Sequence, residues 1–379
     1  GRKSPINSLK RVSIDYQLNN GWKYLGVLGA FAGVLILSYY SVFAGIAFSY
    51  MFNIFPSGLE NPSKYSTNYF SSFAASPLKL ILWHSIFIIF TCLIVGYGVI
   101  KGIGRSVSFL MPIFFIFIIL IAIYSSLIGD IDSTLFFLFN PNFSALTPNV
   151  IISAMGQAFF SLSIGMGAIM AYGAYIPENQ LIGKTVLSII LLDTFVALIA
   201  GIAIFPIVFS NSDLVINAGP SLIFETLPVA FYSLPFGNIF SVLFFVLLSI
   251  AALSSSISLL EPFTAWMEEK VKTERRIIVC ILGLLIWVIG LGSIFSFNVW
   301  AEIKFFGLNF LEGLDFLTNN IMLPVGGFFV ALLTGWVLPK RFLEENLNIN
   351  KPFFKFFFFC LRFISIGAIL LIFLYSAFL

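Results

Sequence analysis

Residues 156–167 read Gly156-Gln157-Ala158-Phe159-Phe160-Ser161-Leu162-Ser163-Ile164-Gly165-Met166-Gly167, at the centre of an uncharged run from residue 133 to residue 177. The run is apolar enough to cross a bilayer, yet its centre carries hydroxyl side chains and a Gly-x-Gly pair. Glycine is a weak helix former, and lipid cannot satisfy backbone groups that leave a helix. Such breaks persist where the backbone lines a protein cavity, and transporters use them to hold substrate and ions. The run therefore predicts a broken helix of a secondary transporter.

The composition places the chain among membrane proteins. It is 59% hydrophobic and 10% charged, and its mean hydropathy is +1.03, a balance that soluble globular proteins do not show. The net charge of +3 gives no support for a nucleic-acid partner. The cysteines Cys92, Cys280 and Cys360 lie far apart in apolar segments and match no metal-ligand spacing, which favours buried, structural thiols.

Apolar windows of about twenty residues predict nine membrane spans in a single domain that covers residues 1–379. The fourth window is the broken one. The predicted spans lie near 22–52, 78–99, 107–128, 147–176, 183–209, 236–266, 275–296, 309–338 and 353–378.

Basic residues alternate between the predicted loops. One set of loops is rich in them: Arg2, Lys3, Lys10 and Arg11, then Lys101 and Arg105, Lys184, the group Lys270, Lys272, Arg275 and Arg276, and finally Lys340, Arg341 and Lys351. The other loops hold only Lys64 and Lys304, with none in 129–146 or 210–235. The positive-inside rule then predicts a cytoplasmic N-terminus and, after nine crossings, an external C-terminus.

Oxygen-bearing side chains inside the predicted spans are the candidates for binding a hard cation such as sodium. Ser161 and Ser163 flank the break, Asp193 is a lone carboxylate in the fifth span, and residues 254–256 are three serines in the sixth. Serines in membrane helices more often bond a carbonyl of their own helix or allow close packing, and both readings stay open for 254–256. For Asp193 the functional reading is favoured, because an intramembrane carboxylate is costly and faces a cavity or a partner.

The aromatic residues and the histidine are open to two interpretations. Tyr39, Tyr40 and Phe160 form either an aromatic wall around an apolar ligand or ordinary core packing. His84 has no titrating partner near it in the sequence, which favours a structural role. The chain shows no nucleophile–base pair, no phosphate loop and no paired ligating histidines, so we expect it not to be an enzyme.

Four segments together resemble the neurotransmitter:sodium symporter family, bacterial branch. Residues 156–168 resemble its sixth helix, 251–256 with Glu261-Pro262 its eighth, 305–315 its tenth, and 219–228 its fourth external loop. The resemblance implies an all-α membrane protein with the LeuT-like inverted-repeat transporter fold. It aligns the nine spans with family helices three to eleven, so that the first two helices are absent and the chain is N-terminally truncated.

By this resemblance, sodium ions are co-transported and bind at two sites. Ser161 and Asp193 correspond to ligands of the first site. Ala251, through its carbonyl, and Ser254 and Ser255 correspond to ligands of the second. Asp193 stands where the family usually has Asn, and Ala197 stands where a chloride ligand or a glutamate is found. The resemblance therefore implies that the Asp193 carboxylate supplies the missing charge and that chloride is not required.

The resemblance also implies an amino-acid substrate. Its ammonium would meet carbonyls freed near Phe160 and Ser163, and Tyr40 would reach its carboxylate. The residues implicated in substrate binding are Ile36, Tyr40, Phe160, Ser163, Met166, Ser255 and Leu259. Asp315 corresponds to the external gate, and Glu269 with Tyr175 to the internal gate.

We therefore expect sodium-coupled symport of an amino acid or similar small amine across a bacterial inner membrane by alternating access. The partners would be this substrate and the lipid bilayer. Two alternatives remain open from the sequence. The chain could be a truncated, non-transporting remnant or accessory subunit, or a proton-coupled carrier of the same fold with Asp193 as the proton site.

Overall fold

The computed structural model describes residues 3–53, 55–176, 182–211, 219–347 and 349–378, and in these ranges the chain is built of helices and loops. The α-helices are α1 (Pro5–Asp15), α2 (Lys23–Tyr50), α3 (Pro62–Ala74), α4 (Pro77–Gly96), α5 (Arg105–Ile128), α6 (Ile131–Phe139), α7 (Pro148–Ser161), α8 (Ala168–Gly173), α9 (Ile182–Phe209), α10 (Leu227–Tyr232), α11 (Gly237–Val271), α12 (Arg275–Phe295), α13 (Phe310–Asp315), α14 (Leu323–Leu332), α15 (Lys340–Leu347), α16 (Lys351–Phe359) and α17 (Ser365–Phe378).

Short π-helical segments join several of these helices into longer rods. The segments Phe316–Met322 and Leu333–Val337 make α13 and α14 one continuous helix, Cys360–Ile364 joins α16 to α17, and Val99–Gly104 leads into α5. A fifth π-helical segment, Leu222–Thr226, precedes α10. π-Helical turns often occur at functional positions, because they open the i→i−4 hydrogen-bond ladder.

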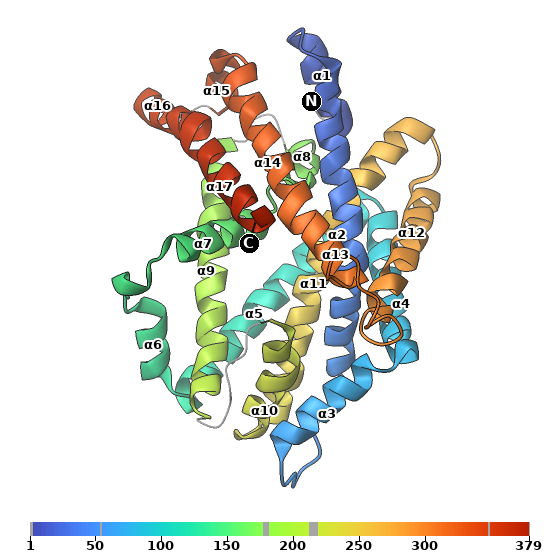
Figure 1. Cartoon of the computed structure of the whole chain (residues 1–379), viewed down its shortest axis with the longest axis vertical. Helices are drawn as coiled ribbons and strands as arrows, with labels where there is room; N and C mark the ends of the chain where they lie inside the picture. The colour runs from blue at the N-terminus through green and yellow to red at the C-terminus, as the bar shows by residue number, and fades with distance from the viewer. Residues whose placement is uncertain (1–2, 54, 177–181, 212–218, 348, 379) are drawn as a thin grey trace.

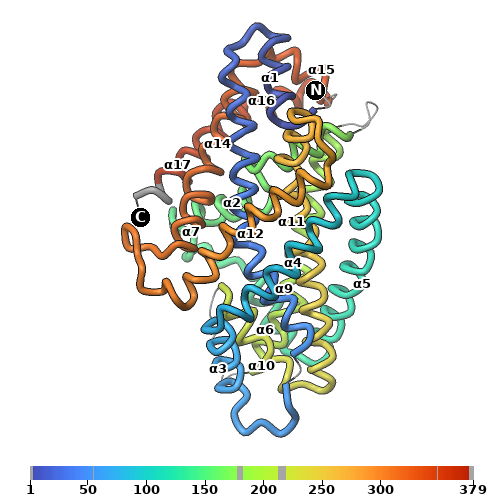
Figure 2. The backbone as a smooth tube through the Cα atoms, turned by 90° about the vertical axis from the view of Figure 1, so that its right-hand side faces the viewer, coloured from blue at the N-terminus to red at the C-terminus, as the bar shows by residue number. Residues whose placement is uncertain are grey.

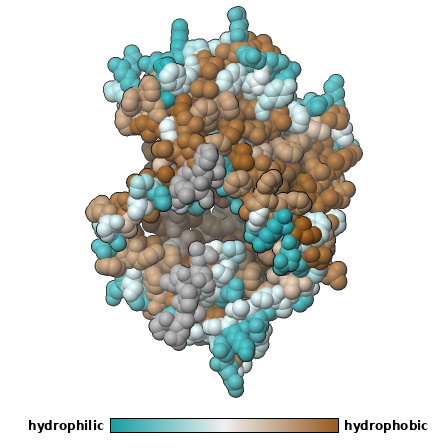
Figure 3. All heavy atoms as spheres, in the orientation of Figure 1, coloured by the Kyte–Doolittle hydropathy of each residue, from teal (hydrophilic) through white to brown (hydrophobic). Residues whose placement is uncertain are grey.

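Eight helical rods in the described part of the chain are long and apolar enough to cross a membrane. They are Asn20–Tyr50, Pro77–Gly96, Val99–Ile128, Ile182–Phe209, Gly237–Val271, Arg275–Phe295, Phe310–Val337 and Lys351–Leu374. The segment predicted as the fourth span is not among them, because α7 ends at Ser161 and α8 begins only at Ala168. Figure 3 shows hydrophobic residues over the middle of one face and hydrophilic residues at its two ends.

The helix α2 is the centre of the molecule, and Figures 1 and 2 both show it running through the bundle. It packs against α11, α4 and α12, and its membrane window is 72% buried. Glycines permit this close packing: a Cβ at Gly33 would lie 2.7 Å from the Leu259 carbonyl oxygen, and one at Gly45 would lie 2.8 Å from the Trp83 backbone. Small residues at helix contacts are the usual means of packing helices in membranes.

The segment after α9 returns to the end of α2. Phe224, Leu227 and Phe231 are buried, and the Tyr50 hydroxyl donates a hydrogen bond of 3.1 Å to the Phe224 carbonyl. The apolar cluster there also includes Phe245 of α11. The short helices at 222–232 therefore cover one end of the α2–α11 pair.

Candidate functional site

The break between α7 and α8 has a strained backbone. Ser163, Gly165 and Gly167 all have positive φ angles, +54°, +88° and +75°. Glycine adopts this region without penalty, but a serine there is strained by about 1–3 kcal/mol, and such strain gathers at functional sites. The chain therefore leaves the helix at residue 162 and resumes it at Ala168.

Two helices hold the break from opposite sides. A Cβ on Gly29 of α2 would lie 2.9 Å from the Gly165 carbonyl oxygen. A Cβ on Gly165 would lie 2.6 Å from the carbonyl oxygen of Leu323, the first residue of α14. Because backbone meets backbone on both sides, only glycine fits these positions, and the break is fixed within the core rather than free in a loop.

The structure brings together Ser161 and Asp193, the two residues predicted for the first sodium site. The Ser161 hydroxyl donates a hydrogen bond of 3.2 Å to Asp193 Oδ2, which joins the end of α7 to α9. Two oxygens at this separation can bind one hard cation. One hydroxyl and one carboxylate supply two oxygens of the kind that a hard cation prefers.

The three serines at 254–256 have different surroundings. Ser254 donates a 2.9 Å hydrogen bond to the Ala251 carbonyl, so these two predicted ligands lie side by side on α11. Ser254 and Ser255 also line a cavity of about 480 Å³. Ser256 is fully buried and pairs with the Thr91 hydroxyl at 2.9 Å. Ser254 and Ser255 thus face open space, and Ser256 packs against α4.

The walls of this cavity carry further hydroxyl groups. Ser258 donates a 3.1 Å hydrogen bond to the Ser254 carbonyl, and Tyr172 lies 2.8 Å from the Ser258 hydroxyl. Tyr172 and Tyr175, which belong to the segment after the break, also line the cavity. An ion or a water molecule there would meet oxygen atoms from α11 and from the region of α8.

Most of the predicted substrate residues gather in one apolar cluster. Ile36, Met166 and Leu259 are buried in it, and Tyr40 packs against it. The Tyr40 side chain lies near the Ser255 side chain, so a polar pair lies at the edge of the cluster. Apolar walls with a few placed polar groups are typical of small-molecule sites.

Phe160 and Ser163 stand apart from that cluster. Phe160 is 40% exposed and lines a cavity of about 410 Å³, together with Gln157 and Asn319. This cavity shares Phe159 and Leu323 with the apolar cluster. Ser163 lies within the break and is half-buried.

The predicted external gate, Asp315, is hydrogen-bonded within its own helical rod. It accepts a 2.7 Å hydrogen bond from the Asn319 amide, which also donates to the Tyr39 hydroxyl at 3.4 Å. Tyr39 in turn lies 3.2 Å from the Thr318 hydroxyl. The sequence allowed Tyr39 to be either part of a ligand-binding aromatic wall or ordinary core packing. In the structure it links α2 to Asp315, Thr318 and Asn319, which are called the Asp315 group below.

The two residues predicted for the internal gate have different partners. Glu269 accepts hydrogen bonds from the Ser4 backbone N–H at 2.8 Å and from the Ser4 hydroxyl at 2.5 Å, and also from the Asn7 amide. It thus sits at the N-terminus of α1, where a negative charge is stabilised. Tyr175 donates a 3.0 Å hydrogen bond to Glu261.

A buried ion pair beside Tyr175 was not predicted from the sequence. Glu261 is fully buried in α11 and contacts the Arg275 guanidinium at the start of α12. Arg275 also binds Glu268 at 2.9 Å and the Val95 carbonyl at 2.8 Å. The signal was present, because a glutamate in an apolar span needs a cationic partner, and Arg275 is the first arginine after it.

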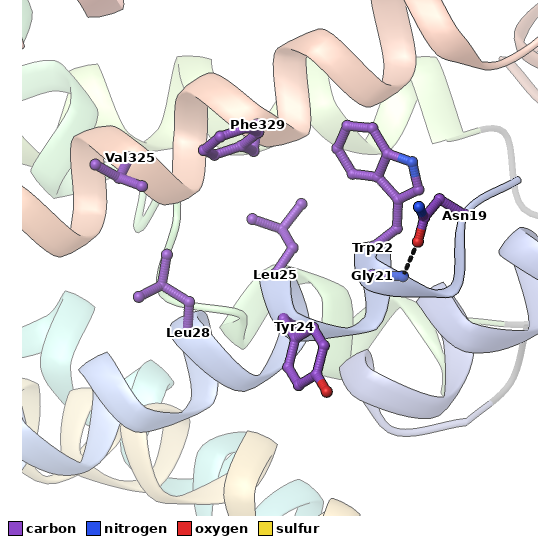
Figure 4. Close-up of a pocket in the computed structure, with 8 residues that line it drawn as sticks. All are labelled: Asn19, Gly21, Trp22, Tyr24, Leu25, Leu28, Val325 and Phe329. Carbon is purple, nitrogen blue, oxygen red and sulfur yellow. Dashed lines mark hydrogen bonds between the residues drawn. The ribbon is translucent and has the colours of Figure 1, made fainter.

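A cavity of about 610 Å³ between the start of α2 and α14 contains none of the predicted site residues. Figure 4 shows Trp22, Leu25, Leu28 and Phe329 around it, with the Asn19 oxygen accepting a 2.7 Å hydrogen bond from the Gly21 backbone. The Asn19 oxygen is engaged in this local turn and Leu25, Leu28, Val325 and Phe329 make much of the lining apolar, so this cavity differs from a substrate site with several convergent polar groups.

Comparison with known proteins gives concordant matches. The sequence profile of the Sodium:neurotransmitter symporter family matches residues 74–379. The chain is 33% identical over 379 residues to an uncharacterized sodium-dependent transporter of Bacillus subtilis. The aligned region covers 99% of this chain and 84% of that relative. It is 31% identical over 393 residues to an uncharacterized sodium-dependent transporter of Haemophilus influenzae, and that alignment covers 100% of this chain and 85% of the relative.

A solved structure has the same architecture. The crystal structure of MhsT in complex with L-phenylalanine matches with a TM-score of 0.88 at 37% sequence identity. The match covers 100% of this chain and 85% of that chain. It confirms the all-α transporter fold that the resemblance implied.

Proposed function

The chain belongs to the Sodium:neurotransmitter symporter family, and we propose that it carries an amino acid or a similar small amine together with sodium across a bacterial inner membrane. Members of this family are transporters rather than enzymes. The observation that carries the proposal is the broken helix at 162–167, which is held between α2 and α14 and joined to α9 through Ser161 and Asp193. Such a break at a helix contact provides backbone and side-chain oxygens inside a membrane bundle.

Sodium binds first between α7 and α9 in this proposal. The Asp193 carboxylate and the Ser161 hydroxyl are its ligands, and the carboxylate supplies a full negative charge that a neutral amide would not. That charge removes the need for chloride. A second sodium ion binds at α11, through the Ala251 carbonyl and the Ser254 and Ser255 hydroxyls.

The substrate binds beside the break. Its apolar side chain packs against Ile36, Met166 and Leu259, which share one buried cluster. The Tyr40 hydroxyl, next to Ser255, binds the carboxylate, and carbonyls freed near Phe160 and Ser163 accept hydrogen bonds from the ammonium. The phenylalanine bound in the MhsT structure supports an amino acid as the substrate class.

Transport then follows alternating access, with nine spans and a cytoplasmic N-terminus. Phe160 closes over the substrate on one side, and the Asp315 group gates the external side. On the internal side, Glu269 holds α1 against α11, and Tyr175 holds the segment after the break against Glu261. Opening inward must break these contacts, so both are positioned to control that step.

Uptake of labelled amino acids into proteoliposomes tests the proposal. An inward sodium gradient should drive accumulation, and a potassium gradient of equal size should not. Uptake that follows a proton gradient and ignores sodium would favour the proton-coupled alternative with Asp193 as the proton site. A folded protein that accumulates no amino acid under either gradient would contradict the symporter.

A further inference from the structure

A groove outside the substrate region lies between α4 and α12, which pack side by side (Figure 1). It encloses a cavity of about 310 Å³ near the end of α4 and the start of α12. Ile89, Cys92 and Leu93 line it from α4, and Cys280 lines it from α12. Ile89 and Leu93 are exposed in this structure, so in a bilayer they face the acyl chains.

The cationic Arg276 side chain closes the end of this apolar groove. The Arg276 guanidinium lies over the Tyr97 ring, 5.3 Å from its centroid, and both residues line the cavity. Its neighbour Arg275 is neutralised by Glu261 and Glu268. No carboxylate within the described ranges lies at salt-bridge distance from Arg276. The ring fixes the guanidinium by a cation–π contact and leaves its hydrogen-bond donors free.

The groove opens at the end of the bundle where basic residues gather. Lys101 and Arg105 follow α4, and Lys270 and Lys272 precede α12. The positive-inside rule assigns this end to the cytoplasmic leaflet, and the inference rests on that orientation. The cytoplasmic leaflet carries anionic lipids, whose negative surface attracts juxtamembrane cations.

We propose that this groove binds an anionic phospholipid. Arg276 contacts the headgroup phosphate, because a guanidinium donates two parallel hydrogen bonds to phosphate oxygens. One acyl chain lies along Ile89 and Leu93, toward the middle of the membrane. A soluble anion would use only the arginine, whereas an anionic lipid offers a phosphate to Arg276 and an acyl chain to the apolar wall, so it fits both halves of the site.

The test measures lipid binding to the purified chain by native mass spectrometry, with phosphatidylglycerol and phosphatidylcholine as probes. Arg276→Gln should weaken phosphatidylglycerol binding about tenfold, because it removes the direct charge-assisted contact with the phosphate that Arg105 does not make. Arg105→Gln is the matched control, because Arg105 is exposed at the same end of the bundle but does not line the groove. Its binding should stay within twofold of the parent chain.

An equal loss in both variants would overturn the proposal, because binding would then follow general charge. Equal affinity for phosphatidylcholine, equal competition by inorganic phosphate, or occupation of the groove by a second copy without lipid would also overturn it. Lipid binding is measured without substrate or a sodium gradient. Failure here is therefore distinct from failure of the transport proposal.

The native cysteines provide a footprint of the groove. Cys280 is exposed on its wall, and Cys360, half-buried in the segment between α16 and α17, serves as an internal reference. Phosphatidylglycerol should slow alkylation of Cys280 by N-ethylmaleimide at least fivefold and leave the rate at Cys360 unchanged. An unchanged rate at Cys280 in lipid-bound protein would place the lipid elsewhere.

Discussion

Asp193 and Ser161 show how far single residues could be assigned before the fold was known. The sequence predicted each as a sodium ligand, and the structure places their oxygens 3.2 Å apart across α7 and α9. An isolated carboxylate inside a membrane costs a few kcal/mol, so it gains most when it binds a cation. The pair is therefore where substitutions will report on ion binding.

Asp193→Asn keeps one oxygen for sodium but removes the negative charge. The attraction between a carboxylate and a sodium ion weakens, and we expect sodium affinity to fall about tenfold or more, which is a loss of at least ~1.4 kcal/mol. Sodium-dependent substrate binding, measured by scintillation proximity with and without chloride, checks this. Ser161→Ala should lower affinity less, because it removes a neutral ligand.

Adding Ala197→Ser to Asp193→Asn should make the remaining sodium-dependent binding sensitive to chloride. Chloride would then replace the lost carboxylate charge. If Asp193→Asn binds sodium like the parent chain and shows no response to chloride, Asp193 is not the charged ligand proposed here.

Glu261 is the residue whose loss should most reduce stability. It is fully buried, and Glu261→Gln would leave the Arg275 charge without its buried partner, at a cost of about 3 kcal/mol. Glu268→Gln is the matched control, since Glu268 is 45% exposed and a pair of that kind contributes about 1 kcal/mol or less. Thermal unfolding in detergent should show a much larger decrease of Tm for Glu261→Gln. Equal decreases would contradict the buried-pair interpretation.

Among helices, the break between α7 and α8 was the element best predicted. Glycines at 165 and 167 marked its position, because they permit positive φ angles in a span otherwise suited to a helix. The sequence could not show that Gly29 and Leu323 enclose it. Those contacts join residues far apart in the chain, and no local pattern encodes them.

Gly165→Ala should disrupt the break. A Cβ there meets the Leu323 carbonyl at 2.6 Å, and alanine is strained at φ +88°, so α14 must move away. We expect a loss of about 2 kcal/mol or more in stability and a strong decrease in substrate affinity. Both are measured by thermal unfolding with and without ligand.

Gly156→Ala provides the comparison for this change. Gly156 lies inside α7, and a Cβ there meets nothing within 4 Å. Alanine is the better helix former, so this variant should be as stable as the parent chain or more stable by up to ~1 kcal/mol. A Gly165→Ala chain as stable as Gly156→Ala would show that the close contact with α14 is not required.

For the whole molecule, hydropathy predicted apolar spans close to several of the helical rods, and the roles of the site residues stay predictions. The helical rods Arg275–Phe295 and Lys351–Leu374 lie close to the predicted spans, because apolar length sets them. The link from Tyr39 to the Asp315 group and the Glu261–Arg275 pair were not foreseen. Both depend on how rods pack, which hydropathy does not specify.

Sodium binding should therefore be visible as a change spread over distant segments of the chain. An ion bound by Ser161 and Asp193 would connect α7 to α9. An ion bound by Ser254 and Ser255 would occupy the cavity that these two serines line with Tyr172 and Tyr175. Hydrogen–deuterium exchange should slow with sodium in 158–167, 190–197 and 251–259, because ligand contacts reduce local opening. The helix α15, which has no buried residue and contains none of the proposed ligands, should exchange at the same rate in sodium and in potassium. In Asp193→Asn the protection of 158–167 and 190–197 should be lost while that of 251–259 persists, since the two ions have separate ligands. Protection confined to α11 in the parent chain would show that the Ser161–Asp193 pair binds no ion.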